Sequence, residues 1–107
     1  MITTFDCPSA GTSTDGAGTY AYSINASGVS TGHYYPDDYT AHGVVRAADG
    51  TITEFDVPGF ETTPLSITNS GAVTGYYAGS DGYPHGFIAA PLMALLTSLL
   101  LVLRELH

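Results

Sequence analysis

The sequence predicts an all-β fold made of two antiparallel, four-stranded, propeller-like repeat units with a short C-terminal helix. The first observation is a set of motifs, Ser-Ile, Ser-Gly, Thr-Gly-x-Tyr and His-Gly, that begin at Ser23, Ser27, Thr31 and His42. The same motifs recur 43 residues later, at Ser66, Ser70, Thr74 and His85. The second observation is that short apolar runs alternate with turn residues. Four short strands repeated every 40 to 50 residues are typical of β-propellers.

The first unit spans about residues 19–57, and its four predicted strands lie at about 19–25, 29–35, 41–47 and 51–57. The strands are separated by short turns such as Ala26-Ser27-Gly28, Pro36-Asp37-Asp38 and Asp49-Gly50. Asp-Gly between two strand-like runs is a strong hairpin signal. We therefore expect consecutive strands to pair antiparallel in a meander.

The second unit spans about residues 64–90 and contains only three predicted strands, at 64–68, 72–77 and 85–89. Residues 2–7 read as a strand, and they match residues 52–57, the fourth strand of the first unit, at an offset of 50 residues. We expect this N-terminal strand, or a strand of a partner chain, to complete the second unit within a β repeat domain over residues 1–91. A propeller needs at least about four blades, so the chain is expected to associate with copies of itself, to be a fragment of a larger propeller, or to close as a smaller β structure. Self-association is the favoured expectation.

Residues 92–107 form a different kind of segment. Leucines at 92, 95, 96, 99, 100 and 103 follow helical spacing, and Pro91 suits a first helical position. Three interpretations are open: a helix packed on the sheet or on a partner chain, a membrane-associated anchor, and an artefact of the reading frame. Twelve residues make about 18 Å of helix, against the roughly 30 Å of a hydrocarbon core.

The charge balance restricts the classes of partner. Ten acidic residues face two basic ones, giving a net charge of −8. Nucleic acids and anionic membrane surfaces require clustered Lys and Arg, so both are disfavoured. The single cysteine, Cys7, corresponds to Val57 and is predicted to be a small apolar residue on a strand. The chain opens without a signal peptide, so we expect it to stay where it is made or to be part of a longer reading frame.

The runs ITEFDVPG, SI-x-x-SG-x-V-TGYY and HGF resemble the repeats of bacterial extracellular repeat proteins of the HAF type. The resemblance covers about residues 2–90 and implies a secreted or surface repeat protein with a propeller-like fold and no established enzymatic activity. The chain departs from the pattern at Val44, where the second unit has Phe87, and at His33, which replaces the first Tyr of Thr-Gly-Tyr-Tyr.

Two repeated His-Gly pairs, His42-Gly43 and His85-Gly86, are predicted to be structural, with each imidazole bonded to backbone within its own unit. A metal site with His33 as third ligand is the alternative, but a tetrahedral site needs convergent ligands. Turn carboxylates such as Asp49 suit calcium, yet their spacing fits ordinary turn chemistry better. No cofactor is therefore predicted.

The predicted ligand-contact surface is formed by tyrosines and carboxylates of two turns: Tyr35, Asp37, Asp38, Tyr39, Asp81 and Tyr83. Tyrosine presents an apolar ring and a polar tip, which suits carbohydrate or protein ligands. The sequence thus favours a non-enzymatic binding module that is secreted or surface-associated. The alternatives are a fragment or protomer of a larger propeller with a structural role and, less favoured, an acid-dependent hydrolase. Membrane contact is expected only through the C-terminal segment.

Overall fold

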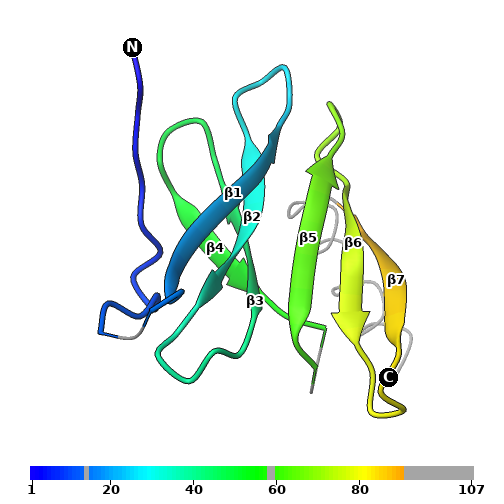
Figure 1. The fold of residues 1–107 in the computed structure, drawn as a ribbon. Helices are drawn as coiled ribbons and strands as arrows, with labels where there is room; N and C mark the ends of the chain where they lie inside the picture. Colours follow the sequence, from blue (N-terminus) through cyan, green and yellow to red (C-terminus); the bar gives the residue numbers. More distant parts are fainter. Residues whose placement is uncertain (14, 58–59, 91–107) are drawn as a thin grey trace, which may run out of the picture.

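The computed structural model describes residues 1–13, 15–57 and 60–90, which form two antiparallel sheets (Figure 1). The first sheet contains, in order, β1 (Gly18–Ile24), β2 (Ser30–Tyr35), β3 (His42–Arg46) and β4 (Ile52–Phe55). The second contains β5 (Thr62–Ile67), β6 (Val73–Ala78) and β7 (Pro84–Ala89). The all-β fold and the antiparallel meander are confirmed. The helix predicted over 92–107 lies outside the described residues.

Glycine determines how closely the strands approach each other. A Cβ atom on Gly32 of β2 would lie 1.9 Å from the carbonyl oxygen of Tyr20 in β1. A Cβ atom on Gly75 of β6 would lie 2.2 Å from the carbonyl oxygen of Thr63 in β5. In both sheets the pairing shifts by one residue just beyond this contact. The Thr-Gly motif of each unit is therefore required by a bulge that brings two backbones together.

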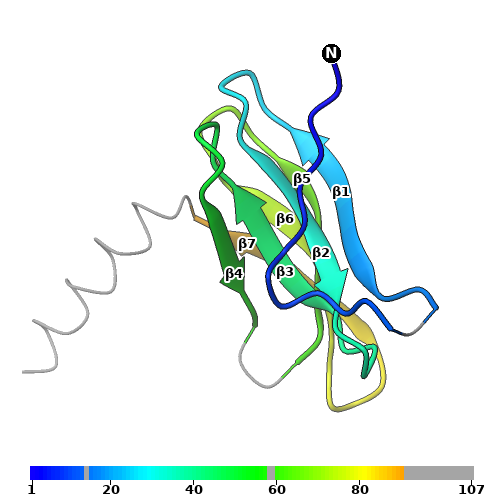
Figure 2. The ribbon, with the colours of Figure 1, turned by 90° about the vertical axis from the view of Figure 1, so that its left-hand side faces the viewer.

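The N-terminal segment corrects one prediction. Residues 1–7 form no strand and do not pair with β7; they lie across the outer face of the first sheet, on the side away from the second sheet (Figure 2). Cys7 is buried there against Tyr34 and Val44, with Ala10 and Ile52 beside them. The prediction that Cys7 lies on a strand is wrong. Within one chain, the second sheet is therefore not completed by residues 2–7.

Glu54 of β4 ties the N-terminal segment to the first sheet. Its carboxylate accepts hydrogen bonds from the Ser9 hydroxyl at 3.2 Å and the Tyr34 hydroxyl at 3.1 Å. The Cys7 thiol donates to the same carboxylate at 3.7 Å. Burial and the nearby Glu54 charge raise the pKa of the Cys7 thiol to about 12, so it is protonated at neutral pH. Burial, followed by the bond to Glu54, also raises the pKa of Tyr34 to about 12.

The two sheets stack face to face (Figures 1 and 2). Phe55 of β4 meets Phe87 of β7 edge-to-face, with ring centroids 6.3 Å apart. Polar contacts add to this apolar one: the Asn25 side-chain amide donates to the Thr68 carbonyl at 2.9 Å, and the Thr62 amide donates to the Ala41 carbonyl at 3.0 Å. Thr62 and Ala41 are both buried, so their bond satisfies a donor and an acceptor that water cannot reach, and it makes the stacking specific as well as favourable.

We predict that Gly32→Ala destabilises the fold by about 3 kcal/mol, because the new methyl group can be accommodated only by moving a backbone carbonyl. Urea unfolding followed by circular dichroism measures the change. Ser66→Ala, an exposed position on β5, is the matched control and should unfold within about 0.5 kcal/mol of the wild type. A Gly32→Ala protein as stable as this control would contradict the close approach of β1 to β2.

Candidate functional site

The residues predicted to contact a ligand lie at one end of the stacked sheets. Asp37, Asp38 and Tyr39 occupy the β2–β3 turn, while Asp81 and Tyr83 occupy the β6–β7 turn, and both turns lie at the bottom of Figure 1. The structure therefore brings the two turns to the same end, as expected for equivalent turns of two stacked units.

The turn carboxylates are engaged in local contacts. Asp37 accepts hydrogen bonds from the amide and hydroxyl of Ser13, at 3.1 and 2.7 Å. Asp38 accepts from the amide and hydroxyl of Thr40, at 3.1 and 2.7 Å. The bonds from Thr40 lower the pKa of Asp38 below its usual 3.8. These carboxylates hold the turns in shape, which is the ordinary chemistry of Asp in turns.

The repeated histidines bond to carboxylates rather than to backbone, which corrects the prediction made for them. His42 Nδ1 lies 2.8 Å from Asp56, which directly follows β4. His85 Nε2 lies 2.9 Å from Asp81, whose pKa is lowered first by the Tyr83 amide and then by His85. Each imidazole also stacks on a tyrosine of the neighbouring strand, His42 on Tyr34 and His85 on Tyr77. Side chains, not backbone, therefore fix the two rings.

Thr40, His42 and Asp56 form a hydroxyl–imidazole–carboxylate chain. Thr40 Oγ1 lies 3.0 Å from His42 Nε2, so the order of groups is that of a nucleophile, a base and an orienting acid. The Thr40 hydroxyl, however, also bonds to Asp38 at 2.7 Å. A hydroxyl carries one proton, and donation to Asp38 takes that proton away from the base. The chain of contacts therefore serves to hold the β2–β3 turn against β4.

The strongest candidate site is an aromatic cluster formed by Tyr20, Tyr22, His33 and Tyr35. The His33 ring stacks on Tyr20 and on Tyr22, each with its centroid 5.1 Å away, and meets Tyr35 edge-on at 4.9 Å. His33 is 3 % exposed, while Tyr20 and Tyr22 are 39 and 52 % exposed. The cluster therefore presents two tyrosine rings to solvent on a buried, rigid base.

The imidazole at the centre of the cluster has an unsatisfied nitrogen. Within the described part of the chain, His33 Nδ1 is buried and has no hydrogen-bond partner. Burial lowers the pKa of His33 below 6.5, so the ring is neutral at pH 7. A buried polar atom without a partner costs about 1–3 kcal/mol, and such atoms gather at functional sites.

Only Tyr35 of the cluster belongs to the surface predicted from the sequence. Tyr20 and Tyr22 were missed because β1 reads as an ordinary alternating strand, and alternation does not say which face is solvated. His33 stands where the second unit has Tyr76, a difference visible in the sequence, but the sequence suggested a function for His33 only as a possible metal ligand. This difference between the two units is the signal that leads to the cluster.

Tyr39 extends the aromatic surface along the β2–β3 turn. Its φ is 63°, in the left-handed region, where the equivalent turn of the second unit has Gly82 with φ 83°. A bulky residue in this region costs of order 1–3 kcal/mol and marks a site where a side chain is held in place. The Tyr39 hydroxyl donates to the Asp15 carbonyl and the Tyr20 hydroxyl to the Gly16 carbonyl, so both rings brace the loop before β1.

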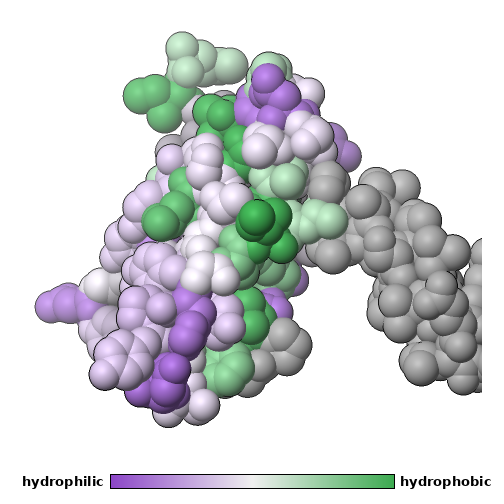
Figure 3. Space-filling view, turned by 90° about the vertical axis from the view of Figure 1, so that its right-hand side faces the viewer, coloured by the Kyte–Doolittle hydropathy of each residue, from purple (hydrophilic) through white to green (hydrophobic). Residues whose placement is uncertain are grey.

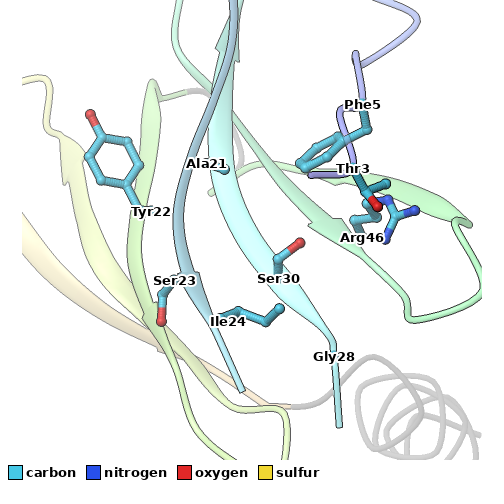
Figure 4. Close-up of a pocket in the computed structure, with 9 residues that line it drawn as sticks. All are labelled: Thr3, Phe5, Ala21, Tyr22, Ser23, Ile24, Gly28, Ser30 and Arg46. Atoms are coloured by element: carbon cyan, nitrogen blue, oxygen red, sulfur yellow. The ribbon is translucent and has the colours of Figure 1, made fainter. Parts of the chain in front are cut away.

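A shallow groove of about 390 Å³ lies between the N-terminal segment and the first sheet (Figure 4). Figure 4 shows Thr3, Phe5 and Arg46 gathered on one side of β2, while Tyr22 points to the other side. The Arg46 guanidinium lies over the Phe5 ring, 5.5 Å from its centroid. Because this contact occupies the cation, the groove offers mainly apolar and hydroxyl groups.

Comparison of the chain with family models, curated proteins and solved structures found no match. Among the described residues, no three His, Cys, Asp or Glu side chains are grouped so that they could hold a metal ion. The same part of the chain contains no helix long and apolar enough to cross a membrane.

We predict that acid weakens the fold through His33. Its pKa is lower in the folded state than in the unfolded state, so the unfolded chain binds more protons as the pH falls below 6.5. The stability contributed by the neutral ring is full above pH 6.5 and is lost below it. In urea unfolding at pH 7 and pH 5, His33→Phe should show a smaller loss of stability than the wild type. Tyr22→Phe keeps both the aromatic ring and His33, so its loss of stability should match that of the wild type. Equal losses in all three proteins would contradict the assignment of the acid sensitivity to His33.

Proposed function

We propose that the chain is a non-enzymatic binding module, secreted or surface-associated, that binds a neutral carbohydrate on the aromatic cluster. The observation that carries the proposal is the pair of exposed rings, Tyr20 and Tyr22, held by stacking on the buried His33. A pyranose ring presents a face of C–H bonds that packs on a tyrosine face. Tyrosine recognises such ligands at low cost in conformational entropy, because it has few rotatable bonds.

Two features of the cluster and the charge of the whole chain support a neutral sugar as the ligand. The rings are fixed before a ligand arrives, which lowers the entropic cost of binding. The unsatisfied His33 nitrogen offers a hydrogen bond that a hydroxyl group could make after a small opening of the cluster. The net charge of −8 disfavours anionic ligands over the whole surface. The secreted or surface location rests on the resemblance to HAF-type repeats.

We expect Tyr22→Ala to weaken carbohydrate binding by at least tenfold. The probes are cellohexaose, chitohexaose and xylohexaose, titrated into the full chain by calorimetry and followed in parallel by tyrosine fluorescence. Tyr83→Ala is the matched comparison, because Tyr83 is 70 % exposed, lies in a turn outside the cluster and belongs to the ligand-contact surface predicted from the sequence, so the two variants separate the two surfaces. The proposal fails if none of the three sugars binds at millimolar concentration. It also fails if Tyr22→Ala binds as tightly as Tyr83→Ala.

A second candidate function is that of a protomer in a larger propeller-like assembly. The observation that favours it is the strand count, because the second sheet has three strands where the first has four. Stacked, twisted sheets of four strands are the blades of propellers, which close with about four to eight blades. Two or more copies of the chain would supply enough blades for such a ring.

A further inference from the structure

The outer edge of β7 is where the second sheet is one strand short of the first. In the first sheet, β3 pairs with β4 in a register that runs from Gly43 opposite Phe55 to Arg46 opposite Ile52. β7 occupies the place of β3 in its own sheet, and within residues 60–90 it is the last strand. An edge strand presents free N–H and C=O groups that can accept a strand from another chain.

The chain also carries a strand-like segment that belongs to no sheet. Residues 2–5 read Ile-Thr-Thr-Phe, against Ile-Thr-Glu-Phe in β4, and Ile2 is 90 % exposed. β-branched and aromatic residues in this pattern favour a paired strand. The segment lies on the opposite side of the molecule from β7 (Figures 1 and 2), so the two cannot meet within one chain.

The N-terminal segment is attached to the first sheet in the way that the end of β4 is attached to the second. The Cys7 amide donates to the Thr19 hydroxyl at 2.9 Å, and the Val57 amide donates to the Thr62 hydroxyl at 2.8 Å. A second pair of bonds also matches: the Ala10 amide donates to the Cys7 carbonyl and the Phe60 amide to the Val57 carbonyl, each at 3.0 Å. Residues 2–10 are therefore held on the first sheet as β4 and the residues after it are held on the second.

We propose that residues 2–7 of one copy pair with β7 of a second copy, antiparallel and in the register of β3 with β4. This register places Phe5 opposite Gly86 and Thr3 opposite Ile88, and it brings Asp6 beside His85. The inference rests on the assembly role stated above and is independent of carbohydrate binding. It names the partner as a second copy of this chain and the contact as a strand added head to tail.

The receiving edge has room for the groups that this register delivers. In the first sheet a Cβ atom on Gly43 would lie 2.8 Å from the Phe55 ring, because that ring covers the glycine. At Gly86 the nearest described atom to such a Cβ is a carbonyl oxygen 3.9 Å away, so no described residue takes the place of that phenylalanine ring. His85 bonds to Asp81 through Nε2. In the first sheet, His42 bonds to Asp56 through Nδ1, so the equivalent atom for a bond to a delivered carboxylate is Nδ1 of His85. Asp6 is the residue equivalent to Asp56.

The outer face of the second sheet fits the same partner. Ile88, Tyr76 and Leu65 are 80, 43 and 43 % exposed, and Figure 3 shows hydrophobic side chains spread over this side of the molecule among weakly polar ones. The outer face of the first sheet of the next copy, which carries the delivered strand, would cover them. A head-to-tail contact repeats until the rotation closes a ring. Two to four copies would give four to eight sheets, the range of known propellers.

The experiment combines the mass of the full-length chain with disulfide trapping. The Thr3→Cys and Ile88→Cys proteins, both altered at exposed positions, are mixed, left to exchange and oxidised. Opposed residues on neighbouring strands are about 4.5–5.5 Å apart at Cα, within reach of a disulfide. We expect intact-mass spectrometry to find a Thr3→Cys/Ile88→Cys heterodimer as the main product. Thr3→Cys mixed with Ser80→Cys, a variant of the exposed β6–β7 turn, is the control for random collision.

Light scattering of Thr3→Pro separates this pairing from other kinds of association. In the β3–β4 hairpin the Ala47 amide donates to the Thr51 carbonyl, so the alternation of the ladder directs the N–H of Thr53, and in the proposed pairing that of Thr3, at the partner strand. Proline at position 3 removes that N–H, so the oligomer should dissociate to a monomer with unchanged circular dichroism, while Thr3→Ala should keep the wild-type mass. A monomeric wild type would overturn both the pairing and the assembly role. An oligomer that survives Thr3→Pro, or that yields no more heterodimer than the Ser80→Cys control, would overturn the pairing alone.

Discussion

A buried threonine hydroxyl is the contact on which the placement of the two sheets depends. Thr62 is fully buried, its hydroxyl accepts the Val57 amide, and its own amide donates to the Ala41 carbonyl. The chain crosses from one sheet to the other at this point, where water cannot satisfy the backbone. Thr19 makes the equivalent contact with Cys7 on the first sheet. The same polar bond therefore positions each incoming segment on the sheet that follows it.

This crossing has consequences for both faces of each sheet. It directs Phe55 toward Phe87 on the inner side, and the equivalent contact of Thr19 directs Cys7 toward Tyr34 and Val44 on the outer side. The core is thus divided between two thin layers, each with few large side chains. In so small a core, close backbone approach at glycine and satisfied polar groups decide the geometry as much as apolar burial does. The aromatic cluster lies where β1 leaves part of the inner face of the first sheet exposed.

The strands were predictable because their signals are local. Alternating apolar residues, short turns and the Asp49-Gly50 pair identify all seven strands of the two sheets, with ends that differ from the structure by one or two residues where the turns are short. The repeat offset of 43 residues also identified Tyr34 with Tyr77 and His42 with His85, and the structure gives each pair the same stacked contact. Patterns of this kind depend only on residues that are close in sequence, so they can be read from the sequence without the fold.

The sequence by itself determined the strand order, the turns, the repeat and the type of strand that residues 2–7 resemble. Only the tertiary structure decided where that segment lies, because its partner is chosen by the crossing at Cys7 and Thr19 and not by its own alternation. The same holds for the site: Tyr20 and Tyr22 come from β1 and His33 from β2, and their stacking follows from the register of these two strands. Register and sheet stacking are set by bonds between residues distant in sequence, so no local pattern encodes them.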